Sequence, residues 1–206
     1  SAYVAFYLNY IEAHHLQLQF RFKAAAKVLK EQVNIIVEYP AIKSNARLAG
    51  ALINYAWNEI YFCNFSNALK EIEKAETLLA PQSINLYQCF ETRFYSYFYL
   101  SEYENAAQYL ALLKAQDDGA TAEFRTGKRE YHSACIAFAR RDHQAVHEIL
   151  RQLNPIEIDD EGWNIGMRFL FIMNDIELEK TENAVLRTEN LRKHLEKLKK
   201  KTNIAK

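Results

Sequence analysis

The sequence predicts an all-α protein built from repeated pairs of antiparallel helices, an α-α superhelix or solenoid. With five glycines and three prolines in 206 residues, the chain holds few of the residues that interrupt helices, and half of it is hydrophobic. Apolar residues recur at helical spacing along the chain. Four alanines are 38, 39 and 39 residues apart, a period typical of helical-repeat arrays: Ala68, Ala106, Ala145 and Ala184.

The N-terminal segment, residues 1–43, is expected to be helical but divergent from the later repeats. Residues 2–39 contain neither Gly nor Pro and carry apolar residues at helical spacing. One long helix and a hairpin that turns near Gln19 both fit this pattern. Tyr39-Pro40 ends the segment, because the residue before a proline is disfavoured in the helical region.

Four helix pairs are expected after this segment, over residues 44–81, 83–119, 121–155 and 160–201, so that residues 1–206 form a single helical-repeat domain. Small polar residues at the expected helix starts predict caps, since their side chains can accept from the first amides of a helix. These residues are Ser44 or Asn45, Ser66, Ser83, Asp142 and Thr181. Ser101-x-x-Glu104 has the spacing of a capping box. The polar last helix, which ends in lysines, is expected to close the array.

Composition argues against several classes of partner. Lys plus Arg equal Asp plus Glu at 26 each, so no net charge would attract nucleic acid or an anionic membrane. No apolar run is as long as a membrane span. The odd number of widely spaced cysteines, Cys63, Cys89 and Cys135, favours free thiols in a reducing compartment. We therefore expect a cytoplasmic protein, whose chain, which begins at Ser1 without Met, is processed or cut from a longer one.

The repeats resemble the tetratricopeptide repeat, whose unit carries W-x2-L-G-x2-Y on its first helix, A-x3-F on its second, and a closing proline. The matching residues are Leu52, Tyr55, Ala56, Ala68, Ile72 and Pro81 in the first unit, Phe90, Tyr97, Ala106 and Leu110 in the second, and Ala134, Ala145 and Ile149 in the third. The period exceeds the family's 34 residues, Glu59 replaces the first unit's tyrosine, and Phe94 replaces a small residue. An array of HEAT type is the alternative. The resemblance implies a right-handed superhelix with a concave groove for peptides, and no catalysis.

Enzymatic readings have little support in the sequence. His143 and His147 lie one helical turn apart and suggest a metal-dependent hydrolase only remotely, because the glutamate of an HExxH motif is absent. No phosphate-binding loop, calcium loop or nucleophile elbow is present. We therefore expect a non-enzymatic protein that needs no metal and no cofactor.

Aromatic residues supply the predicted binding surface. Positions that should face the concave side of the first helices are Trp57, Tyr61, Tyr95, Tyr99, Tyr131 and Phe138. Glu91 and Arg129 are expected to supply charges near this groove. The alternative is that these aromatics pack between neighbouring units instead of contacting a ligand. The predicted function is a scaffold that binds a protein or peptide; the alternative is a sensor or regulatory domain of a longer signalling or transcription-regulating protein.

Overall fold

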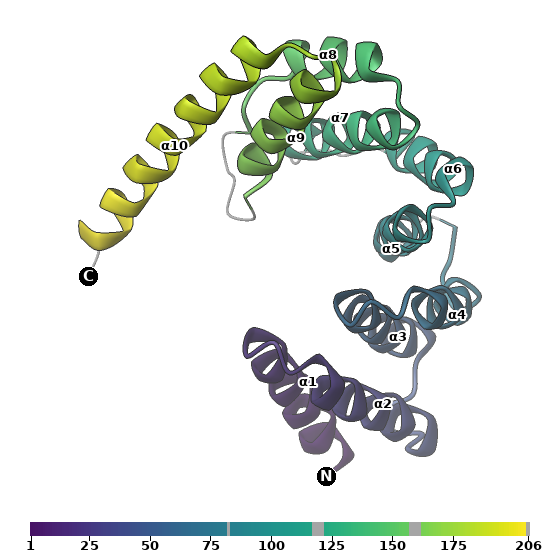
Figure 1. The fold of residues 1–206 in the computed structure, drawn as a ribbon. Helices are drawn as coiled ribbons and strands as arrows, with labels where there is room; N and C mark the ends of the chain where they lie inside the picture. Colours follow the sequence, from purple (N-terminus) through teal and green to yellow (C-terminus); the bar gives the residue numbers. More distant parts are fainter. Residues whose placement is uncertain (82, 117–121, 157–161, 205–206) are drawn as a thin grey trace. The chain divides into compact units, whose positions relative to one another are not determined.

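The computed structural model describes residues 1–81, 83–116, 122–156 and 162–204, and within them the chain forms ten helices and no strand (Figure 1). This confirms the all-helical class. The helices are α1 (Ala2–Leu18), α2 (Phe22–Glu38), α3 (Asn45–Tyr61), α4 (Phe65–Glu76), α5 (Asn85–Tyr99), α6 (Tyr103–Lys114), α7 (Ala122–Ala139), α8 (His143–Gln152), α9 (Trp163–Glu177) and α10 (Thr181–Ile204). The predicted boundary between the second and third pairs, at residues 119–121, and the predicted start of the fourth pair, at residue 160, lie outside the described residues.

The chain divides into two compact units, Ser1–Gln116 with α1 to α6 and Asp117–Lys206 with α7 to α10. Within each unit every helix packs on the next one in sequence. In the first unit α3 also contacts α5, so the first helices of successive pairs lie side by side (Figure 1). Sequential pairing of this kind is consistent with a helical-repeat array.

The N-terminal segment is a hairpin of two helices, which settles the alternative that the sequence left open. Helix α1 ends at Leu18 with Gln19 as its C-cap, and α2 begins at Phe22. Between them Phe20 takes a positive φ of 58°. The segment therefore forms a first helix pair like the later ones.

One turn recurs between the two helices of all five pairs. A residue other than glycine holds the left-handed conformation, with φ between 56° and 63°: Phe20, Cys63, Ser101, Arg141 and Glu179. The residue after it donates its backbone N–H to the carbonyl five residues back, at 2.8 to 2.9 Å. This is the long hydrogen bond of a Schellman motif, which satisfies a carbonyl left open at a helix end. A left-handed turn thus marks each of the five helix pairs, whereas the regularly spaced alanines mark four.

Counting from each turn shows which residue fills the crossing of the two helices. Five residues after the left-handed position, the chain carries a small side chain that is almost fully buried in each pair: Ala25, Ala68, Ala106, Val146 and Ala184. From the regular alanine spacing we expected Ala145 to be the buried residue of the third unit; this was wrong, because Ala145 is partly exposed and Val146 takes the buried place. The third turn comes one residue later than the alanine spacing implied.

The predicted caps are confirmed in part. The Ser44 side chain accepts from the amide of Arg47 at 3.2 Å, and the Asp142 side chain accepts from the amide of Ala145 at 3.0 Å. Ser66 lies inside the first turn of α4 and does not cap it. The capping box at Ser101 was wrong as well, because Ser101 holds the left-handed turn and α6 begins two residues later.

Candidate functional site

A continuous line of aromatic rings crosses α3 and α5 in the first unit. Helical spacing places Trp57 beside Tyr61 on α3 and Tyr95 beside Tyr99 on α5, with ring centroids 6.3 Å and 6.5 Å apart. Trp57 meets Tyr95 edge to face at 5.5 Å, which joins the two helices. These four predicted residues therefore come together in the fold.

Two phenylalanines extend the line at its ends. Tyr61 stacks on Phe22 at 5.5 Å with 21° between the rings, and Tyr99 stacks on Phe65 at 5.1 Å with 18°. Phe22 and Phe65 are each the first residue of a second helix, so the two stacks are one contact repeated at successive pair junctions. Neither phenylalanine was predicted from the sequence to belong to the binding surface, although each lies two residues after a left-handed turn residue. We call the six residues the aromatic row: Phe22, Tyr61, Trp57, Tyr95, Tyr99 and Phe65.

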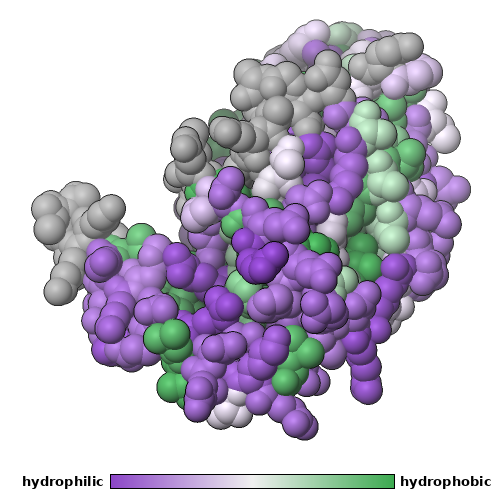
Figure 2. All heavy atoms as spheres, turned by 90° about the horizontal axis from the view of Figure 1, so that it is seen from above, coloured by the Kyte–Doolittle hydropathy of each residue, from purple (hydrophilic) through white to green (hydrophobic). Residues whose placement is uncertain are grey.

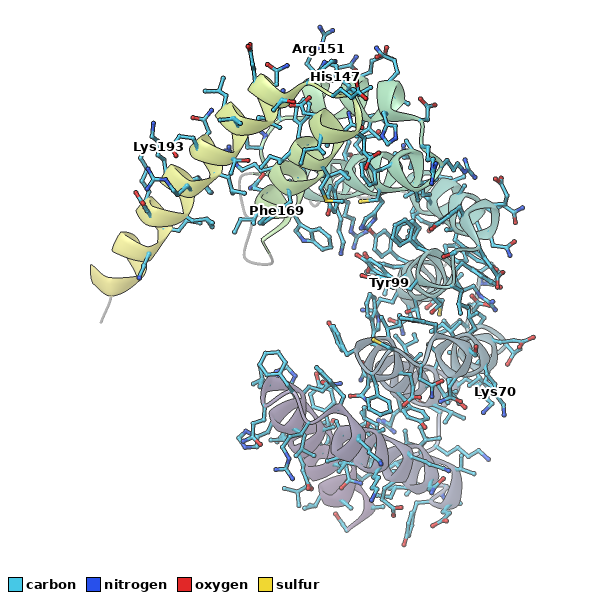
Figure 3. All side chains as sticks on the ribbon, in the orientation of Figure 1. Lys70, Tyr99, His147, Arg151, Phe169 and Lys193 are labelled. Carbon is cyan, nitrogen blue, oxygen red and sulfur yellow. The ribbon has the colours of Figure 1, made fainter. Side chains whose placement is uncertain are left out.

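The aromatic row combines packing with exposure. Trp57, Phe65 and Tyr95 pack against the core of the first unit and are partly buried. Tyr61 and Tyr99 are each 56% exposed, well above what a core residue shows. In Figure 3 Tyr99 lies on the side of α5 that faces away from α6. Rings of the row thus both join neighbouring pairs and present two tyrosines to solvent.

Asn58 fixes the pair junction beneath the row. Its side-chain amide donates to the backbone carbonyl of Phe22 at 3.0 Å, and its Oδ1 accepts from Gln17 at 3.2 Å. The side chain is fully buried. Because Asn58 lies one turn before Tyr61 and binds the backbone of Phe22, it holds in place the two residues that stack.

The predicted charges do not reach this surface. Glu91 is 8% exposed and Arg129 is 5% exposed, so both side chains lie inside the fold. This differs from the expectation that they orient a peptide from the rim of a groove. The exposed part of the row is consequently neutral, with tyrosine hydroxyl groups as its polar atoms.

Tyr131 and Phe138 belong to the second unit, where each takes part in packing. The Tyr131 ring contacts Trp163 at 5.9 Å, and a Cβ placed on Gly166 would lie 2.9 Å from the Tyr131 hydroxyl oxygen. Phe138 meets the His143 ring at 5.4 Å. A side chain at Gly166 of α9 would thus require the Tyr131 ring to shift. The row itself runs from α2 to α5 within the first unit.

His143 and His147, the pair that could suggest a metal-dependent hydrolase, pack against different partners. His143 Nδ1 lies 3.1 Å from Asn174 Oδ1, while the His147 ring packs edge to face on Phe171 at 5.5 Å. Among the described residues no group of three or more His, Cys, Asp or Glu side chains is placed to hold a metal ion.

Two hollows lie away from the row. In the first unit, α2, α3 and α4 enclose a groove of about 600 Å³ with an apolar floor that includes Val33 and Leu52 and a rim that includes Lys30 and Lys70. Figure 3 shows Lys70 on the outer side of α4. In the second unit a cavity of about 180 Å³ lies among α8, α9 and α10.

Most of the surface seen in Figure 2 is hydrophilic, and hydrophobic atoms appear on that face as smaller patches. In the described part of the chain, no helix has both the length and the apolar character that crossing a membrane requires. All three cysteines are free thiols, as the sequence predicted.

No protein-family model matches this chain, and no curated protein matches it.

Proposed function

We propose that this chain is a tetratricopeptide-like scaffold that binds a protein or peptide segment along the aromatic row, without catalysis. The observation that carries the proposal is the exposure of Tyr61 and Tyr99, each held on a stacked phenylalanine and linked through Trp57 and Tyr95. The six rings come from three successive helix pairs and form one connected line across them.

The tetratricopeptide-like assignment has support in the repeated turn and in the small residue buried at each helix crossing. The family pattern asks for a small residue at that crossing and for a helix pair as the unit. The longer period and the buried Glu59 depart from it. Glu59 accepts from the side-chain amides of Asn64 and Asn67, at 2.6 Å and 2.9 Å, and so ties α3 to the turn and to α4.

Binding to such a row would rest on ring faces and hydroxyl groups. Tyrosine and tryptophan provide large contact areas with few rotatable bonds, which is why they dominate recognition surfaces. Stacking on Phe22 and Phe65 already fixes the orientation of Tyr61 and Tyr99, so little rotamer entropy remains to be lost on binding. The rings and hydroxyl groups of the row would contact apolar and hydrogen-bonding groups of such a segment.

Tryptophan fluorescence gives a direct test. The chain has two tryptophans, Trp57 in the row and Trp163 in the second unit, so a Trp163→Phe variant reports from Trp57 alone. We would select ligands for this variant from a displayed library of random peptides. Selected peptides should change the Trp57 emission in a saturable way, and Tyr61→Ala with Tyr99→Ala should weaken binding at least tenfold.

The matched control is Phe169→Ala, which removes a half-exposed aromatic residue of α9 outside the row. It should leave the affinity unchanged. Peptides that bind equally well to the double tyrosine variant would place the binding surface elsewhere and overturn the proposal, as would a library that yields no saturable binder.

A further inference from the structure

Helix α1 presents an apolar strip that the first unit does not cover. Its buried side, with Ala13 and Leu16, faces α2. On the opposite side five large side chains are between 56% and 67% exposed: Val4, Tyr7, Leu8, Ile11 and Leu18. We call these five residues the α1 strip. A contiguous apolar surface of this kind on a soluble domain marks an interaction site.

Equivalent positions in later first helices indicate the role of the α1 strip. Counting back from the left-handed turns, Leu8 of α1 holds the place of Ala51 in α3, Cys89 in α5 and Met167 in α9. Those three residues are 3%, 0% and 9% exposed, whereas Leu8 is 58% exposed. Each of the three belongs to a core cluster shared with the second helix of the preceding pair. The α1 strip therefore corresponds to a surface that later pairs bury against the preceding second helix, and among the described residues it is exposed.

Two further positions support this equivalence. Leu18 corresponds to Tyr61, which stacks on Phe22 of the preceding helix α2, and His15 corresponds to Asn58, which binds the Phe22 carbonyl. Leu18 is 67% exposed and His15 is exposed as well. The whole junction surface thus lies open on α1.

A second copy of this chain can cover the strip in one of two ways. In a head-to-tail arrangement α10 of the second copy would pack on α1 as α2 packs on α3. Counted from the left-handed turns, Arg192 and Leu195 hold the places of Val33 and Ile36, which pack in the core cluster of Ala51. This contact would therefore place a charged side chain against the strip. In a symmetric arrangement α1 would pack on α1 of the second copy.

Charge and spacing favour the symmetric arrangement. Glu12 is the one Asp, Glu, Lys or Arg residue in α1, and it lies to the side of the strip, so two copies bring no like charges together across their contact. Val4, Leu8, Ile11 and Leu18 follow the alternating three- and four-residue steps of a helix–helix seam, with His15 between the last two.

We propose that two copies of this chain associate through their α1 helices in a two-fold symmetric dimer, with the α1 strips packed face to face. Ile11 lies at the middle of the strip, so it meets Ile11 of the second copy whether the two helices run parallel or antiparallel. The aromatic row lies on α2 to α5, and none of its six residues belongs to the α1 strip.

Sedimentation equilibrium of the full chain tests the proposal, with dimers expected at micromolar concentration. Leu8→Glu with Ile11→Glu should raise the dimer dissociation constant at least a hundredfold while the circular dichroism spectrum stays helical. Val37→Glu is the matched control, because Val37 is 50% exposed on α2 outside the strip. A monomer at all concentrations, a dimer that the two glutamates leave intact, or chains that grow with concentration would each overturn the proposal.

Disulfide cross-linking tests the same contact between α1 helices without a variant that disrupts it. In a Cys63→Ser background, which removes the exposed native thiol, Ile11→Cys should form a disulfide-linked dimer under mild oxidation. Val37→Cys in the same background should remain monomeric in a denaturing gel. Equal cross-linking of both variants would show non-specific collision and count against the dimer.

Discussion

Asn174 donates its side-chain amide to the backbone carbonyl of His143 at 3.0 Å, which is the same bond that Asn58 makes to Phe22. Each asparagine lies five residues before a left-handed turn, and each accepting residue opens the second helix of the preceding pair. Both side chains are fully buried. The bond therefore joins one helix pair to the next at matching places in the two units.

Loss of this bond should destabilise the protein. Asn58→Ala and Asn174→Ala each leave a buried backbone carbonyl without that donor, which costs about 1–3 kcal/mol. Urea unfolding monitored by circular dichroism measures the change. Asn45→Ala, at an exposed position in the first turn of α3, should stay within about 0.5 kcal/mol of the parent. If the buried and exposed variants unfold alike, the asparagines do not fix the pair junctions.

The repeat register gives a second prediction. Ala68→Leu and Ala106→Leu should each lower the free energy of unfolding by about 1–3 kcal/mol, because no space exists for three more carbons at a filled helix crossing. Ala145→Leu should be tolerated, since Ala145 is partly exposed, whereas Val146→Ala should open a cavity and destabilise. Thermal unfolding ranks the four variants. A loss for Ala145→Leu as large as that for Ala68→Leu would restore the register that the alanine spacing implied.

The helical class and the pairing of the helices could be predicted from the sequence, because scarce Gly and Pro and the apolar periodicity act locally. The position of Ala145 could not be predicted for a physical reason. The left-handed turn at Arg141 lies one residue later than the alanine spacing implies, and nothing in Gln144-Ala145-Val146 shows which side chain faces the helix crossing. The left-handed turns were missed because their residues, such as Phe20 and Arg141, have no preference for that conformation. Tertiary packing imposes it on them.

The candidate site was predicted better by helical spacing than by charge. Trp57, Tyr61, Tyr95 and Tyr99 come together because spacings of four residues and of one repeat place them on one side of α3 and α5. Glu91 and Arg129 were expected on the surface because charged residues seldom lie inside. Their burial depends on three-dimensional contacts that a linear pattern does not encode.

A buried histidine should make stability depend on pH. Burial, assisted by the nearby Lys128, lowers the pKa of His132 to about 3 from an ordinary value of 6.5. The folded protein therefore keeps this ring neutral at pH values where the unfolded chain protonates it. Since the unfolded state binds the extra proton, stability falls as pH drops from about 6.5 toward 3, by up to about 1.4 kcal/mol per pH unit for this group.

Comparison with a variant isolates the contribution of His132. Urea unfolding between pH 7 and about pH 4.5 should give a shallower loss of stability for His132→Gln than for the parent, whatever the variant's stability at neutral pH. Ser133→Ala is the control on the same helix, because it removes a hydroxyl bond to the Arg129 carbonyl but no titrating group. Parallel curves for the parent and His132→Gln would show that the ring is protonated in the folded protein too.

The three thiols should differ in reactivity because the fold separates their environments. Burial raises the pKa of Cys89 to about 12, with a contribution from the negative charge of Glu76, and burial raises the pKa of Cys135 to about 11. The thiolate is the reactive species, so both should react slowly with a disulfide reagent at pH 8. Cys63 is exposed in the turn between α3 and α4 and should react first.

Titration with the disulfide reagent should find one rapidly reacting thiol in the native protein and three thiols in unfolded, unreduced protein. Cys63→Ser should abolish the rapid phase alone, whereas Cys89→Ala should leave it intact and remove one slow equivalent. Two rapid equivalents in the native protein would mean that α5 or α7 opens readily, and a single equivalent after unfolding would mean that two of the cysteines form a disulfide.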